Sequence, residues 1–112
     1  MSPDLATVTA HVAQLREVSE NSTATEALLV QIEDRLTEGY AWALTGDAWS
    51  MRTEERLHEL RSDTLVVDDH DHRALARGHI RFRRDLTALR RELAALLRER
   101  DRLRADRRAC SG

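Results

Sequence analysis

Residues 86–103 read LTALRRELAALLRERDRL, and this stretch decides the fold. Leucine recurs there at steps of three and four residues, while arginine and glutamate fill most of the places between. Such a leucine strip on one side of a helix has to be buried against another helix in water. We assign residues 73–108 to this helix. Its predicted buried positions are Leu75, His79, Phe82, Leu86, Leu89, Leu93, Leu96, Arg100 and Leu103.

Two further segments carry helical periodicity. Residues 24–62 repeat in heptads, with leucine at both ends and small residues in the middle. We expect this helix to continue through Gly46, because the heptad phase is the same on both sides of it. The predicted buried positions are Leu29, Ile32, Leu36, Gly39, Ala43, Gly46, Ser50, Thr53, Leu57 and Leu60. Residues 4–19 form a shorter amphipathic helix with Leu5, Val8, Val12 and Leu15 on one side.

These segments predict an all-α fold in a single helical domain, residues 1–112. A tip loop at 63–72 joins the two long helices, and so short a connection makes them an antiparallel coiled-coil hairpin. Residues 109–112 form a polar tail. We expect Ser2 to cap the first helix and Ser22 or Thr23 to cap the second. A thin rod buries little surface by itself, so a dimeric helical bundle is expected.

Charge supports the hairpin and suggests its register. Residues 1–72 hold 5 arginines and 15 acidic residues, whereas residues 73–112 hold 13 arginines and 5 acidic residues. We describe the register by the sum of the residue numbers of two core positions that face each other. If this sum is 139, Gly46 lies opposite Leu93, and large residues meet small ones along the interface. The flanks of that register pair opposite charges. The predicted pairs are Glu33–Arg104, Asp47–Arg90, Glu54–Arg83, Arg35–Asp106 and Arg56–Asp85.

Composition excludes several functions. The chain has no lysine, which removes Schiff-base catalysis and the P-loop lysine, and its single cysteine, Cys110, excludes a disulfide framework. No catalytic triad, metal site or cofactor motif is recognised, so no enzyme activity, metal or cofactor is expected. The N-terminus has no signal-peptide pattern and no stretch is apolar enough to span a membrane. We therefore expect a cytoplasmic protein that does not bind membranes.

The best candidate for a binding surface is an aromatic girdle on the helix at 24–62. Tyr40 lies on one flank of the buried strip, Trp42 and Trp49 on the other, and Leu44 and Met51 on a further stripe. Clustered Trp and Tyr are frequent hot spots of protein interfaces. Arginines spaced seven apart mark the outer side of the last helix, a surface suited to an acidic protein and less to nucleic acid. These arginines are Arg77, Arg84, Arg91 and Arg98.

Two functions follow from these surfaces. The favoured hypothesis is a non-enzymatic interaction module, a regulatory or scaffold protein that docks onto a protein partner through the girdle and forms a homodimer. The alternative rests on the tip, where Asp68, Asp69 and Asp71 stand close together. An acidic tip on an antiparallel coiled coil resembles the secondary-channel factors of bacterial RNA polymerase, which implies a modulator of the transcription machinery. The small residues from Gly39 to Ser50 indicate either close helix packing or a ligand pocket between the helices.

Overall fold

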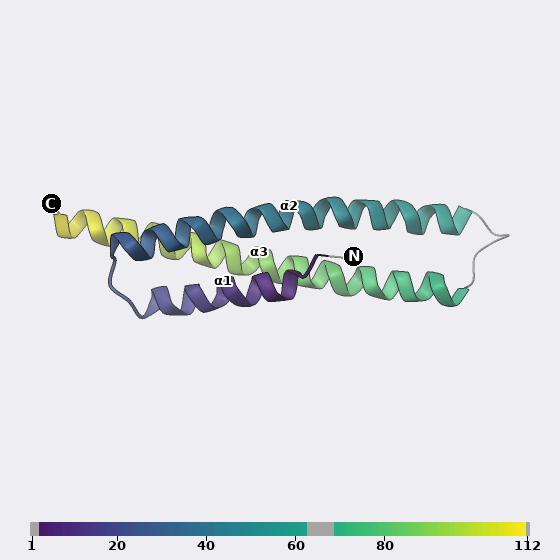
Figure 1. Cartoon of the computed structure of the whole chain (residues 1–112), viewed down its shortest axis with the longest axis horizontal. Helices are drawn as coiled ribbons and strands as arrows, with labels where there is room; N and C mark the ends of the chain where they lie inside the picture. The colour runs from purple at the N-terminus through teal and green to yellow at the C-terminus, as the bar shows by residue number, and fades with distance from the viewer. Residues whose placement is uncertain (1–2, 63–68, 112) are drawn as a thin grey trace.

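The structure is a computed structural model that describes residues 3–62 and 69–111. Three helices follow one another: α1 (Leu5–Glu20), α2 (Glu26–Ser62) and α3 (Asp69–Ser111). Figure 1 shows α2 and α3 lying antiparallel along the whole length, with the shorter α1 beside one half of them. The molecule measures 70 × 18 × 17 Å and its radius of gyration is 19.0 Å, against about 13 Å for a compact chain of this length. The all-α prediction is confirmed, and the shape is a rod.

Helix α1 begins one residue later than predicted because Asp4 caps it. The Asp4 carboxylate accepts hydrogen bonds from the Thr7 backbone N–H at 3.1 Å and from the Thr7 hydroxyl at 2.6 Å. These bonds hold the pKa of Asp4 below its ordinary value. The prediction of Ser2 as the cap is therefore wrong. Asp4 stands directly before the first buried residue, Leu5, which is where a cap belongs.

Helix α2 is capped by Thr25. Its hydroxyl accepts the Leu28 backbone N–H at 3.1 Å, so the predicted caps, Ser22 and Thr23, are both wrong. The hydroxyl of Ser22 instead donates back to the Val18 carbonyl at the end of α1. From Glu26, α2 runs without a break through Gly46, as predicted.

Helix α3 is longer than predicted at both ends: it continues to Ser111, so residues 109–111, which were assigned to a polar tail, are helical. Residues 69–72, which were assigned to the tip loop, form its first turn, and residues 63–68 lie outside the described residues. An acidic residue in the first turn of a helix interacts favourably with the helix dipole. Asp71 supplies such a charge, so the run of aspartates fits a helix start as well as a loop.

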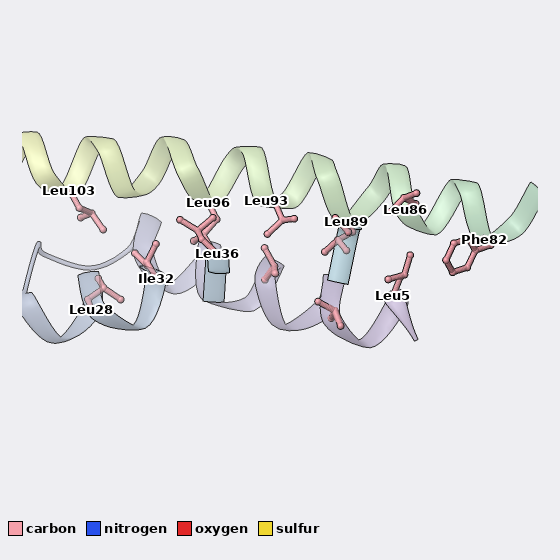
Figure 2. Packing of buried hydrophobic residues seen from close by; sticks show 13 residues of the cluster. Leu5, Leu28, Ile32, Leu36, Phe82, Leu86, Leu89, Leu93, Leu96 and Leu103 are labelled. Atoms are coloured by element: carbon pink, nitrogen blue, oxygen red, sulfur yellow. The ribbon is translucent and has the colours of Figure 1, made fainter. Parts of the chain in front are cut away.

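The core is a leucine-rich strip shared by the three helices. Figure 2 shows Leu96 and Leu103 of α3 on the side that faces Leu36, Ile32 and Leu28 of α2, with Leu5 of α1 close to Leu86 and Phe82. Leu89, Leu93 and Leu96 are completely buried. In the two long helices, every predicted core position is buried or half-buried. The heptad assignments are thus confirmed, except that Leu28, which was not assigned to the core, is buried more deeply than the predicted Leu29. Helix α1 joins the same core through Leu5, Val8 and Val12.

The predicted facing of the core residues is wrong by one heptad. A Cβ added to Gly46 would lie 3.0 Å from Leu86, while one added to Gly39 would collide with Leu93. Facing core positions therefore sum to 132 rather than 139. The space beside Gly46 is filled by Leu86, Leu5 and Phe82, so the small residues serve close packing. The alternative of a ligand pocket at this position is wrong.

One predicted row of ion pairs is nevertheless present. Asp47 pairs with Arg90, Glu33 with Arg104, and Glu54 with Arg83 at 3.6 Å. In each helix the Cα–Cβ bonds lean toward the N-terminus, so on antiparallel helices two residues offset by about one turn lean toward each other. Two side chains therefore meet when their residue numbers add up to 137, although backbone positions at the same height along the rod have numbers that add up to about 132.

The second predicted row of ion pairs is wrong. Arg35 pairs with Glu38 at 3.1 Å and Asp106 with Arg102 at 3.1 Å, each within its own helix. Arg56 likewise lies 3.8 Å from Glu59 rather than bridging to Asp85. The residue numbers of both predicted pairs add up to 141, nine positions from the level sum of 132, so the partners lie about 13 Å apart along the rod. Helix α1, which the two-helix register left out, packs against both long helices, and Arg16 bonds to Glu92 of α3 at 2.6 Å.

Beyond the N-terminal end of α1, the rod is only two helices thick. We call residues 47–62 of α2 and 69–81 of α3 the arm; in Figure 1 they extend past the N-terminus. The inside of the arm is partly polar. Ser50, Thr53 and His79 are buried there together with Leu57.

Over the described residues, no helix is long and apolar enough to cross a membrane.

Candidate binding surfaces

Four large exposed apolar side chains lie on the side of the hairpin that carries the Asp47–Arg90 and Glu54–Arg83 ion pairs. Tyr40, Leu44 and Met51 of α2 are 41, 70 and 62% exposed, and Ile80 of α3 is 54% exposed. Steps of four and seven residues place the three α2 residues in one stripe, with Asp47 among them. On α3, Thr87 lies seven residues from Ile80 and lines the same depression as Met51. We call these five residues the open face.

Two ion pairs beside the open face are closed within the chain. The Asp47–Arg90 and Glu54–Arg83 ion pairs lie in the depression that Met51 and Thr87 line. The Thr87 hydroxyl donates to the Arg83 carbonyl at 2.9 Å, so it needs no further acceptor. Covering this depression would therefore bury apolar groups and paired charges, whereas an unpaired buried charge costs much more.

Helix α1 occupies a different side of the hairpin. His11, Leu15 and Val18 of α1 line a groove with α2 residues from Gln31 to Glu38. Against α3, Arg16 bonds Glu92, and the Arg102 guanidinium donates to the Ser19 carbonyl at 3.1 Å. Arg102 also holds the pKa of Glu99 below its ordinary value through a side-chain hydrogen bond. These polar contacts lock α1 in place and leave the open face uncovered.

The predicted aromatic girdle is divided between two sides. Trp49 packs against Phe82, with ring centroids 4.2 Å apart and planes at 50°, and it is half-buried against the core. Trp42, one heptad earlier on the same flank, is 37% exposed. Tyr40 lies on the opposite flank in the open face, as the sequence predicted. Trp49 is thus mainly a structural residue, and Tyr40 with its apolar neighbours offers the larger accessible surface.

The four predicted outer arginines have no ionic partner among the residues that the structure describes. Arg77, Arg84, Arg91 and Arg98 are all exposed, and within residues 3–62 and 69–111 none of them lies within ion-pair distance of an acidic group. Most other arginines of α3 do form ion pairs, including Arg83 and Arg90 one position away. The outer arginines therefore form a row of positive charge along the edge of the open face.

The structure brings together a serine, a histidine and a carboxylate that the sequence did not connect. Ser50 Oγ and His79 Nε2 are 2.9 Å apart in the interior of the arm, and Glu54 Oε1 lies 3.8 Å from the same nitrogen. A hydrolytic triad needs the hydroxyl and the carboxylate on different ring nitrogens, with the hydroxyl facing the substrate. Here both approach Nε2 and Ser50 is buried between two helices. The arrangement is a satisfied polar contact of the core.

The tip supports no metal site among the residues that can be described. Asp68 lies outside them, and Asp71 is exposed on the first turn of α3. Over residues 3–62 and 69–111, no group of three potential ligands stands close enough to hold a metal ion. Cys110 is a free, exposed thiol near the C-terminal end of α3.

Comparison with known proteins adds no relative: no family model, no curated protein and no solved structure matches this chain.

Proposed function

We propose that this protein is a non-enzymatic interaction module, a small regulatory or scaffold protein that binds a helical protein surface through the open face. The observation that carries the proposal is the exposure of Leu44, Met51 and Ile80 beside charges that are already paired. Large apolar side chains gathered on one side of a protein are typical of protein interfaces. Tyr40 adds an aromatic anchor at the end of the face, as interface hot spots often do.

A matched pair of variants tests the proposal. Leu44→Glu places a charge in the open face, and Thr45→Glu places the same charge at the next position, about 100° around α2. Both residues are exposed, so neither substitution disturbs the core. In affinity capture from native lysate, we expect at least one protein to bind the wild type and Thr45→Glu but not Leu44→Glu. Chemical cross-linking then has to map that protein to α2 and α3. Capture of the same proteins by all three forms would contradict the proposal.

The alternative function, a transcription modulator acting through the acidic tip, stays a prediction. The antiparallel rod of 70 Å suits a protein that reaches into a channel, but Asp68 lies outside the described residues. Asp71→Asn would separate the hypotheses, because a tip mechanism depends on that carboxylate and an open-face mechanism does not.

A further inference from the structure

The rod exposes more surface than its mass requires. Its accessible area is 7757 Å², whereas a compact monomer of 12.8 kDa exposes about 6,300 Å². The excess, about 1,500 Å², is larger than the ~800 Å² that each partner contributes to an interface of standard size. The molecule can therefore bury a full interface and still expose as much surface as a compact protein does.

The two long helices are electrostatically complementary. Helix α2 holds eight acidic residues and four arginines, and α3 holds thirteen arginines and seven acidic residues. A second copy that places its α2 on α3 of the first brings opposite charges together twice, since the contact is repeated by symmetry. Placing α2 on α2 brings like charges together instead.

The height of the residues along the rod supports the same arrangement. When a two-fold axis lies parallel to the helices, equal residues of both copies have equal height. The register inside one protomer then fixes the register between protomers. Within the chain, level core positions of α2 and α3 sum to 132, as Gly39–Leu93 and Gly46–Leu86 do. Side chains inside the chain meet at sums from 131, as Trp49 and Phe82 do, to 137, as Asp47 and Arg90 do. Across the dimer, α2 residues should therefore face α3 residues whose numbers add up to a value in the same range.

The open face satisfies this condition with apolar and complementary residues. Met51 falls level with Ile80 and Leu44 with Thr87, and each of these pairs sums to 131. Tyr40 falls level with Arg91, whose guanidinium can stack on the ring. Glu55, exposed on α2, falls level with Arg77, which has no ionic partner among the described residues. One axis thus brings all four pairs level, at sums of 131 or 132, without any adjustment along the rod.

We propose that two copies of this chain pair side by side through the open face, on a two-fold axis parallel to the helices, with α2 of each copy lying along α3 of the other. This inference rests on the proposed function, since it names the helical protein surface that the open face binds. The four long helices form the centre of the dimer and the two α1 helices lie on its outside. Both arms point the same way, and both Cys110 residues lie at the same end.

Exchange of one contact between two variants tests the interface. Met51→Glu and Ile80→Arg each put a charge against an apolar residue at both contacts of a homodimer. In a mixture, the heterodimer has one Glu–Arg pair and one unchanged Met51–Ile80 contact. By sedimentation or light scattering we expect the wild type and Thr45→Glu to be dimers. Each single variant should dimerise at least ten-fold more weakly, and the mixture should recover most of that loss. Both residues are exposed, so circular dichroism should show unchanged helix content.

The orientation is tested by spin labels on the native Cys110. Parallel arms place the two labels about 15–35 Å apart, because neighbouring helix axes lie about 10 Å apart. Antiparallel arms separate them by up to the 70 Å length of the rod. A long distance, or no recovery in the mixture, overturns the arrangement. A wild type that remains at 12.8 kDa at high concentration overturns the dimer. In that case the proposed function still stands if Leu44→Glu loses a different protein that Thr45→Glu retains, and falls if it does not.

Discussion

The two glycines at positions 39 and 78 should respond in opposite ways to the same substitution. Both lie inside long helices, where replacing glycine by alanine stabilises by about 1 kcal/mol through helix propensity alone. At Gly78 no atom lies within 4 Å of the added Cβ, so nothing opposes this gain. At Gly39 the Cβ would collide with the side chain of Leu93, which is completely buried.

The magnitude follows from these surroundings. Forcing an extra carbon into a packed core costs about 1–3 kcal/mol, because neighbours move off their preferred rotamers. We therefore expect Gly78→Ala to raise the free energy of unfolding by about 1 kcal/mol. Gly39→Ala should lower it by up to about 2 kcal/mol after the propensity gain is subtracted. Gly46→Leu belongs with Gly39→Ala: its added side chain meets Leu86 and Leu5, and a loss of about 1–3 kcal/mol is expected.

Urea or guanidinium unfolding followed by circular dichroism measures all three variants. Every sample is compared at one protein concentration, since self-association would shift the transition. Leu93→Ala tests whether the collision is the cause of the loss. The double variant Gly39→Ala, Leu93→Ala should lose less free energy of unfolding than the two single variants together, because Leu93→Ala removes the colliding atoms. If Gly39→Ala is as stable as Gly78→Ala, the close approach of α2 and α3 at Leu93 is refuted.

Three further predictions concern polar contacts. Glu54→Arg should destabilise by ~0.5 kcal/mol, and adding Arg83→Glu should restore most of that in a double-mutant cycle of thermal melts; no restoration would contradict the ion pair. Ser50→Ala should cost about 1–2 kcal/mol in urea unfolding, since it leaves buried His79 without its hydroxyl partner, and an unchanged midpoint would show that water replaces it. Because the pKa of Glu99 is lowered in the folded state, its charged form stabilises the fold above about pH 4.5, and this stabilisation is lost as the pH falls through the folded pKa. The difference in melting temperature between wild type and Glu99→Gln should therefore shrink on acidification. A difference that stays the same as the pH falls would contradict the interaction.

The heptad pattern predicted the fold because burial follows helical periodicity closely. Every position assigned to the core of α2 and α3 is at least half-buried, from Leu29 to Leu103. The facing of those positions could not be predicted from charge. Side chains of antiparallel helices lean toward each other across one turn, so the Asp47–Arg90 ion pair forms although the facing core positions have residue numbers that add up to 132. The same ion pair is equally consistent with a sum of 139, so it does not distinguish the two registers.

The missing information was the position of α1. Leu5 sits against Gly46, and Arg16 and Ser19 take polar contacts with Glu92 and Arg102 of α3. A model with two helices assigns such residues to the wrong partners or to solvent. The periodicity of residues 4–19 showed that a helix forms, and nothing in its spacing showed which side of the hairpin it covers.

The distribution of apolar side chains gives the arm and the open face a common physical basis. Where α1 is present, completely buried leucines such as Leu89 and Leu93 fill the interior. In the arm, Ser50 and His79 are buried while Met51 and Ile80, their immediate neighbours in sequence, face solvent. A helix pair with polar groups inside and apolar groups outside gains little from its own closure, because the hydrophobic term scales with apolar area removed from water. Covering Met51 and Ile80 adds the burial that the arm interior does not supply. The stability of the arm should therefore depend on whether the open face is covered. We expect amide hydrogen exchange in residues 47–61 to slow as the protein concentration rises. Exchange around Leu93 should stay the same over this range of concentration.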